Sequence, residues 1–346
     1  MEPQAEVAER FLHGNDELRD ALGIPRGAGL EPVPLGQGEH NANFWFAHPE
    51  TGRKLVLRIN YASQLGLHDQ VLYERAALEA LAPSGRVPRP LFADNSRSRI
   101  DHGVLVTEFR EGSHLDFGKP GNVEEAARIL ADVHSVQLES GCGLIRPDDP
   151  LRAQLEACRG FFAAYRGTPL EERHVVRAVE RFFELTEEAL AAPVDEADCC
   201  HVQNTEAVPS HFLIPDDGPG SMVDWEKPVI GEVAQDVAYF LSPTTTIWDT
   251  DYVFDAPARQ AFVDAYWRAV DGRFPRGFFD ERFPAYVRSN CLLGITWSCN
   301  AWVEYHDPER PLKNAKTFEL LKTYLSEDYL RQVAAICFEH AGSMSG

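Results

Sequence analysis

The order of apolar and polar positions along the chain changes character near residue 110. Before that point, short apolar stretches alternate with turns rich in Gly, Pro and Asn, which is typical of β-strands. The stretches are residues 31–35, 43–47, 54–59, 91–93 and 104–109. Helical periodicity in this part is confined to residues 2–23 and 69–81. The pattern predicts a small sheet of about five strands with one internal helix.

After Gly112 the apolar positions recur at helical spacing. The predicted helices cover residues 122–138, 151–165, 170–192, 256–271, 281–305 and 313–340. Asn122 and Glu125 have the spacing of a capping box at the start of the first of these helices. Residues 198–225 form a non-helical island with three short predicted strands, 199–203, 211–214 and 221–223. A β-rich lobe over residues 1–110 and a larger, mainly helical lobe over residues 111–346 indicate an α+β fold.

The charge of the chain narrows the set of partners. With 33 Lys and Arg against 54 Asp and Glu, the formal net charge is −21. This charge excludes a broad nucleic-acid surface and disfavours anionic membranes. The sequence has no apolar run of 18 residues and no signal peptide, and its seven cysteines are scattered without a CxxC pair. We therefore expect a cytoplasmic protein with reduced thiols that acts as a monomer or homodimer.

Two features of the predicted sheet could hold a nucleotide. Gly36 and Gly38 lie in the turn between the first two strands, where glycine lets backbone N–H groups approach a phosphate, although two glycines are more often simply a turn. Arg58 lies between apolar residues of a strand, and Glu74 lies on the helix that follows. An exposed strand arginine is the simpler interpretation, but a strand cation paired with a helix carboxylate is how kinases hold nucleotide phosphates.

Within the non-helical island, three ionisable side chains lie at predicted strand ends. They are Glu206, His211 and Asp224, and we expect them to converge near one point. Asp224 directly follows the apolar pair Met222 and Val223, a position where a metal-binding carboxylate can be held rigidly beside a cleft.

These residues resemble the aminoglycoside phosphotransferase and choline kinase family, relatives of the protein kinases. The family's catalytic loop reads His-x-Asp-x-x-x-x-Asn, followed by a strand, Asp-Trp or Asp-Phe, and a later Asp-Leu-Ala. The chain has Asn204-x-Glu206-x-x-x-x-His211, then Asp224-Trp225-Glu226, then Asp236-Val237-Ala238, all at the family's spacing. The resemblance covers roughly residues 31–245, and the Asp-Trp-Glu segment with its downstream Asp is its most specific part.

The resemblance implies a bilobal protein-kinase-like fold that binds ATP or GTP with Mg²⁺ or Mn²⁺ and phosphorylates a small-molecule hydroxyl. Each candidate residue then takes a role. Gly36, Gly38 and Asn41 would cover the phosphates, Arg58 would replace the usual Lys and pair with Glu74, and Glu108 and Arg110 would lie at the nucleotide-binding hinge. Asp224 and His211 would face the metal, Asp236 would brace the catalytic loop of Asn204, and Glu206 would orient or deprotonate the acceptor hydroxyl.

The catalytic loop departs from the family pattern at each of its three specified positions. An alternative register that starts at His201 puts Gln203 and Val208 at the functional positions and fits worse. Glu206 keeps a carboxylate but adds a methylene, and His211 replaces an oxygen ligand by imidazole, which suits Mn²⁺ or Zn²⁺ better than Mg²⁺. One metal on Asp224, a different metal, no metal, or a His211 that contacts phosphate all remain open. So do three functions: an active phosphotransferase, a nucleotide-binding pseudokinase and an adenylyl transferase.

The acceptor pocket is expected in the helical part. Residues 248–252 and 297–305 combine aromatic side chains with carboxylates, which can hold an amine. Trp297, Ala301 and Tyr305 recur every four residues, however, as a core-facing stripe does. Residues 242–246 are expected to be a loop that ends a helix or borders the cleft. Aminoglycoside-like, amino-alcohol-like and sugar-like acceptors are all compatible with the resemblance.

Overall fold

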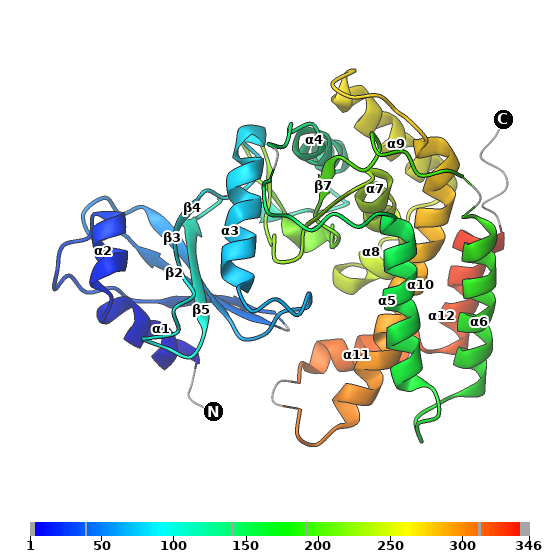
Figure 1. Cartoon of the computed structure of the whole chain (residues 1–346), viewed down its shortest axis with the longest axis horizontal. Helices are drawn as coiled ribbons and strands as arrows, with labels where there is room; N and C mark the ends of the chain where they lie inside the picture. The colour runs from blue at the N-terminus through cyan, green and yellow to red at the C-terminus, as the bar shows by residue number, and fades with distance from the viewer. Residues whose placement is uncertain (1–3, 39, 140, 191, 311–312, 340–346) are drawn as a thin grey trace. The chain divides into compact units, whose positions relative to one another are not determined.

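The computed structural model of the chain describes residues 4–38, 40–139, 141–190, 192–310 and 313–339 (Figure 1). The chain forms two compact units. The first unit contains residues 1–114, 136–144 and 211–228, and the second contains residues 115–135, 145–210 and 229–346. The part of the expected non-helical island that follows residue 210 thus belongs to the first unit. The expected lobe boundary near residue 110 stays a prediction.

The first unit is built on a five-stranded antiparallel sheet in the order β1-β2-β3-β5-β4. The strands are β1 (Val33–Gln37), β2 (Asn41–Ala47), β3 (Lys54–Asn60), β4 (Pro90–Asp94) and β5 (Gly103–Glu108). The predicted turn at residues 48–53 closes the β2–β3 hairpin, where His48 N–H donates to the Arg53 carbonyl at 2.8 Å. The expected five strands are confirmed.

Alternation along β3 separates an apolar face of the sheet from a polar one. Leu55, Leu57 and Ile59 are buried in a core with α1 (Gln4–His13) and α2 (Asp16–Leu22). Arg58 points to the opposite face, and its cross-strand partner in β2 is Asn43. Helix α3 (Gln70–Leu81) packs on β4 and β5. The period of two in a strand therefore places Arg58 away from the apolar face.

A second, smaller sheet of the first unit joins segments that are distant in sequence. Its strands are β6 (Ser113–His114), β8 (Phe212–Ile214) and β9 (Ser221–Met222), in the order β6-β8-β9. Gly112 precedes β6 with φ of +141°, and a Cβ built there would lie 2.9 Å from the Ile214 nitrogen. This close approach of two backbones requires glycine.

The second unit packs around one long helix, α10 (Phe279–His306), drawn in gold to orange in Figure 1. Its neighbours are α5 (Pro150–Tyr165), α6 (Arg173–Glu188), α7 (Ala234–Leu241), α8 (Pro243–Asp249) and α11 (Ala315–Tyr324). Helix α4 (Asn122–His134) packs on α9 (Ala256–Val270), and β7 (His201–Gln203) pairs with β10 (Val229–Gly231). The last described elements are α12 (Glu327–Val333) and a π-helical turn, Ala334–Glu339.

Several expected boundaries were wrong. Residues 2–23 form two helices, since the Asn15 side chain accepts from Leu18 N–H and begins α2. Residues 313–340 divide into three helical segments, because the Ser326 side chain caps α12. The predicted cap at Asn122 is absent: Gly121 is the N-cap residue of α4, with no side-chain cap bond. Helices α7 and α8 and strand β10 were not expected, because short elements carry few periods of the apolar pattern.

None of the helices in the described part of the chain is both long enough and apolar enough to cross a membrane.

Gly112→Ala tests the backbone contact. We expect the free energy of unfolding to fall by about 2 kcal/mol or more, since Ala at this φ is strained and its methyl group meets backbone rather than a movable side chain. Gly160→Ala is the control, because Gly160 lies within α5 with open space around it and should gain about 0.5–1 kcal/mol. Urea unfolding measures both; an unchanged stability in Gly112→Ala would contradict the account.

Candidate active site

A buried guanidinium is the centre of the polar face of the first unit. Arg58 Nη1 lies 3.1 Å from Glu74 Oε1 on α3 and 2.8 Å from Asp224 Oδ1, which follows β9. Arg58 Nε donates to Asn43 Oδ1 at 3.2 Å. The predicted pairing of Arg58 with Glu74 is confirmed, and Asp224 joins the same cluster. A guanidinium can bind several acceptors at once because its N–H donors form a planar fork, whereas the charge of an ammonium is concentrated at one atom.

The charges in this cluster shift one another's proton affinities. Burial would raise the pKa of Asp224, but the Coulombic attraction of Arg58, with a smaller contribution from His211, outweighs the effect of burial and lowers the pKa to about 2. Burial raises the pKa of Glu74 despite the nearby Arg58. The pKa of Arg58 is raised because the attraction of Asp224, Glu74 and Glu226 exceeds the cost of burial. Asp224 is therefore a carboxylate at any physiological pH.

Glu226 belongs to this cluster, although no role was predicted for it from the sequence. It is buried, and its carboxylate accepts hydrogen bonds from the side chains of Asn41 and Gln64, the latter at 2.8 Å. The Gln70 side chain donates to its backbone carbonyl. The sequence signal that could have identified Glu226 is its position, two places after Asp224 and next to the fully buried Trp225. Asn41 is thus bound to Glu226, and its expected contact with phosphate stays a prediction.

His211 and Asp224 are brought together by the β8–β9 hairpin. Val223 N–H donates to the His211 carbonyl at 2.9 Å, one position beyond the pair Phe212 and Met222. His211 Nε2 then lies 3.7 Å from Asp224 Oδ2. Asp224 has φ of +63°, a left-handed conformation that is strained for Asp and is often found at functional sites. Two of the three side chains that were expected to converge do so here, while Glu206 belongs to the second unit.

The predicted glycine turn and hinge also lie in the first unit. Gly36 sits at an irregularity in the β1–β2 pairing, and Gly38 N–H donates to the Asn41 carbonyl at 2.9 Å. Residue 39 lies outside the described residues. Glu108 ends β5 and pairs with Arg110 at 2.9 Å and Arg53 at 3.1 Å. The side chains of Glu108 and Arg110 therefore bind each other, and a nucleotide at this hinge would be left to contact the backbone.

Asp236 braces the loop that carries Glu206 in the second unit. Its buried carboxylate accepts the Asn204 N–H at 2.6 Å and the Thr205 N–H at 2.8 Å. The Asn204 side chain in turn accepts Glu206 N–H at 3.1 Å. Thr205 has φ of +69°, which is strained for a residue other than glycine. The two N–H groups that donate to the Asp236 carboxylate therefore hold a strained turn in place. The expected bracing contact is confirmed, and it positions the half-buried Glu206.

The expected acceptor segments divide between core and surface. Ala301 and Tyr305 are buried with Leu321, and Trp297 packs against them, which confirms the core-facing stripe. Trp248 on α8 meets Trp297 edge-on, with ring centroids 5.5 Å apart. Residues 243–249 form α8 and are not the expected loop.

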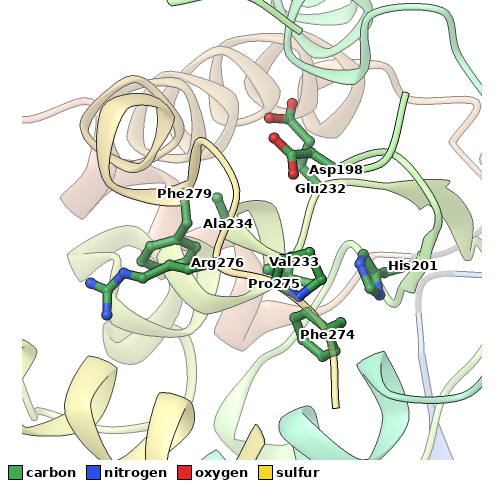
Figure 2. A pocket seen from close by; sticks show the side chains of 9 residues that line it. All are labelled: Asp198, His201, Glu232, Val233, Ala234, Phe274, Pro275, Arg276 and Phe279. Carbon is green, nitrogen blue, oxygen red and sulfur yellow. The ribbon is translucent and has the colours of Figure 1, made fainter. Parts of the chain in front are cut away.

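A separate cavity in the second unit, about 260 Å³ with the solvent at its mouth, is lined by the nine residues of Figure 2. Its polar groups already have partners. Glu232 accepts from Arg282 at 2.7 Å and Tyr286 at 2.5 Å, Asp198 accepts the Phe278 N–H at 3.0 Å, and His201 Nδ1 donates to the His134 carbonyl at 2.7 Å. This cavity is structural, and it also disfavours the register in which His201 begins the catalytic loop.

Comparison with known proteins decides the family. A sequence model described as the phosphotransferase enzyme family matches residues 31–279. The chain belongs to this family. A search of curated proteins finds no match.

Solved structures share the fold of this phosphotransferase family member over most of its length. One is described as a putative aminoglycoside phosphotransferase from Ralstonia eutropha, with a TM-score of 0.63, 16% identity and 98% of each chain covered. An ethanolamine kinase from Plasmodium vivax has a TM-score of 0.63, 13% identity and covers 93% of this chain and 87% of its own. Spectinomycin phosphotransferase, solved with ADP and spectinomycin, has a TM-score of 0.60, 12% identity and covers 92% and 94%. The predicted α+β, protein-kinase-like fold is confirmed.

Asp236→Ala tests the bracing of the loop. The change leaves two buried N–H groups without an acceptor, at about 1–3 kcal/mol each, so we expect a loss of several kcal/mol in the free energy of unfolding. Asp216→Ala, on an exposed loop, should change it by less than about 0.5 kcal/mol. Equal urea midpoints for the two variants would contradict the bracing role.

His201 should make stability depend on pH. Burial lowers its pKa from 6.5 to about 4, so the unfolded chain binds the proton more readily and stability falls as pH falls through this window. Between pH 7 and pH 5 this contributes a loss of about 2 kcal/mol. Chemical unfolding at both pH values should show a smaller loss in His201→Gln than in the natural protein. An equal loss would mean that His201 does not contribute.

Proposed function

We propose that the protein transfers the γ-phosphate of ATP, or of GTP, to a hydroxyl of a small molecule. The arrangement that carries the proposal is the Arg58 cluster, in which one guanidinium binds both Glu74 and Asp224. Membership of the phosphotransferase enzyme family supports the same reaction class. The proposed acceptor is an aminoglycoside-like, amino-alcohol-like or sugar-like molecule. The seven cysteines form no disulfide, and we propose a cytoplasmic enzyme that acts as a monomer or homodimer.

Arg58 can serve the nucleotide while it holds the carboxylates. Its Nη1 is used by Glu74 and Asp224 and its Nε by Asn43, and its Nη2 has no hydrogen bond to any residue that the structure describes. We propose that Nη2 donates to a nucleotide phosphate, beside the turn at Gly36 and Gly38. Phosphoryl transfer depends mainly on positioning and charge neutralisation, which such a fixed fork supplies.

The charge of the cluster favours a bound cation. Arg58 is faced by three carboxylates, those of Glu74, Asp224 and Glu226, so an anionic nucleotide would meet an excess of negative charge. The candidate ligands are the carboxylate oxygen Oδ2 of Asp224 and the imidazole of His211, a set that fits a divalent ion. We propose that Asp224 and His211 hold this ion, which when bound would neutralise phosphate charge.

Glu206 is the proposed base. It would accept the proton of the acceptor hydroxyl as that oxygen forms its bond to the γ-phosphorus and the bond to the nucleotide's β-phosphate oxygen breaks. Asn204 and Asp236 act through it, because they fix the backbone of the loop. A glutamate reaches about one methylene farther than the family's aspartate, so the acceptor must sit correspondingly farther from this turn.

The exchanged residues favour a second candidate, a pseudokinase that binds nucleotide without transfer. Glu206 and His211 both stand where the family pattern has other residues. Nucleotide binding would then stabilise the protein while no acceptor is phosphorylated. Adenylyl transfer is a third possibility that the same nucleotide site would allow.

Activity of single variants tests the assignments. In a screen of hydroxyl metabolites for ATP consumption with Mg²⁺ and with Mn²⁺, the natural protein should phosphorylate at least one acceptor. Glu206→Gln should lower kcat by about 10²–10⁴-fold, since it removes the base. Asp224→Asn should abolish phosphoryl transfer. The control, Asp216→Asn on an exposed loop, should leave the rate of transfer unchanged.

The outcomes separate the candidates. Full activity in Asp224→Asn would contradict the metal assignment. If phosphorylated product appears only after Glu206→Asp and His211→Asn are combined, the natural protein is the nucleotide-binding pseudokinase. Release of pyrophosphate with an adenylylated product would identify adenylyl transfer.

A further inference from the structure

We infer that His211 makes this a nitrogen-containing metal site that prefers Mn²⁺ to Mg²⁺ in the nucleotide complex. The inference rests on the proposed nucleotide site and concerns the identity of its ion. It depends on how His211 and Asp224 face each other.

The two oxygens of Asp224 are in different surroundings. Oδ1 is bound by Arg58 at 2.8 Å, whereas Oδ2 faces His211 Nε2 at 3.7 Å. That separation is too long for an N–H···O hydrogen bond, whose donor–acceptor distance is at most about 3.2 Å. Two donors that each lie about 2.1 Å from one ion are about 3 Å apart at a right angle and at most about 4.2 Å apart. The observed spacing is therefore within reach of a shared ion and outside that of a direct bond.

Neither ring nitrogen of His211 forms a hydrogen bond with a residue that the structure describes. Nδ1 is buried and has no hydrogen-bond partner among the described residues. If Nδ1 carries the proton, the Nε2 lone pair faces the carboxylate oxygen across the gap, an arrangement that a cation between them would stabilise. The protein backbone fixes this geometry, because the β8–β9 hairpin sets the spacing of residues 211 and 224.

The ion must arrive with other ligands. Among the described residues, no group of three or more His, Cys, Asp and Glu side chains is arranged to hold a metal. Asp224 and His211 would supply two donors, and nucleotide phosphates and water would supply the rest, as is usual for metal–nucleotide sites. Imidazole suits Mn²⁺, while Mg²⁺ strongly prefers oxygen, so the nitrogen shifts the preference towards the transition metal.

The first test is spectroscopic. Mn²⁺ and ADP are added to the full-length protein, and pulsed electron paramagnetic resonance detects coupling of the Mn²⁺ electron spin to a directly bound imidazole ¹⁴N. We expect this coupling in the natural protein and its loss in His211→Asn and His211→Gln. The control is His68→Asn, because His68 forms an exposed pair with Asp69 at 2.7 Å in the same unit and should leave the coupling intact.

The second readout is affinity. The ratio of the ADP dissociation constants with Mg²⁺ and with Mn²⁺, measured by titration calorimetry, should favour Mn²⁺ in the natural protein. The ratio should fall by roughly tenfold or more in His211→Asn, a loss of the size that removal of a metal-site partner produces. His68→Asn should retain the natural ratio.

Several results would overturn the inference. These are Mn²⁺ bound with ADP but without ¹⁴N coupling, no Mn²⁺ binding at all, or a metal preference that His211→Asn leaves unchanged. In each of these cases His211 is not a ligand of the ion. The proposed phosphoryl transfer fails separately, since a protein with the nitrogen-coupled Mn²⁺–ADP complex that phosphorylates no acceptor would refute the transfer and retain the metal site.

Discussion

The buried guanidinium of Arg58 is the interaction on which the first unit's polar face depends. It connects a strand, a helix and the segment after a distant hairpin through Glu74 and Asp224. Because it is planar, it can bind these carboxylates on one side and leave Nη2 for a phosphate. Removing one partner of a buried ion pair costs about 3–5 kcal/mol, since a charge is then left uncompensated. The arginine is therefore both a structural element and the proposed nucleotide contact.

Backbone geometry supplies the second constraint in each unit. In the first unit, the β8–β9 hairpin holds His211 beside Asp224. In the second, Asp236 holds the strained turn at Thr205 and thereby the loop of Glu206. Both arrangements fix one candidate residue through backbone hydrogen bonds, so the side chains that differ from the family pattern lie on well-held backbone. This explains how a changed residue can occupy the site without disrupting the fold.

Much of this was predictable from sequence because the signals were local. The alternation in residues 54–59 identified the face on which Arg58 lies, and the every-four spacing of Trp297, Ala301 and Tyr305 identified a core stripe. Short elements such as α7 and β10 were missed, since a few residues cannot express a period. The cap at Asn122 was wrong because Gly121, in a left-handed conformation, takes that position. The contacts of Glu226 with Asn41 and Gln64 span more than 160 residues, so its place after Asp224 could mark Glu226 as a candidate but could not identify its partners.

The most direct measurement is a double-mutant cycle on Arg58 and Asp224, read out as the free energy of unfolding. The account predicts that Arg58→Met and Asp224→Asn are each strongly destabilising, while the double variant loses much less than their sum. The coupling free energy should be about 2 kcal/mol or more, within the range found for residues in one ion-pair network. Additive effects of the two changes would show that Arg58 does not organise the site and would contradict the account.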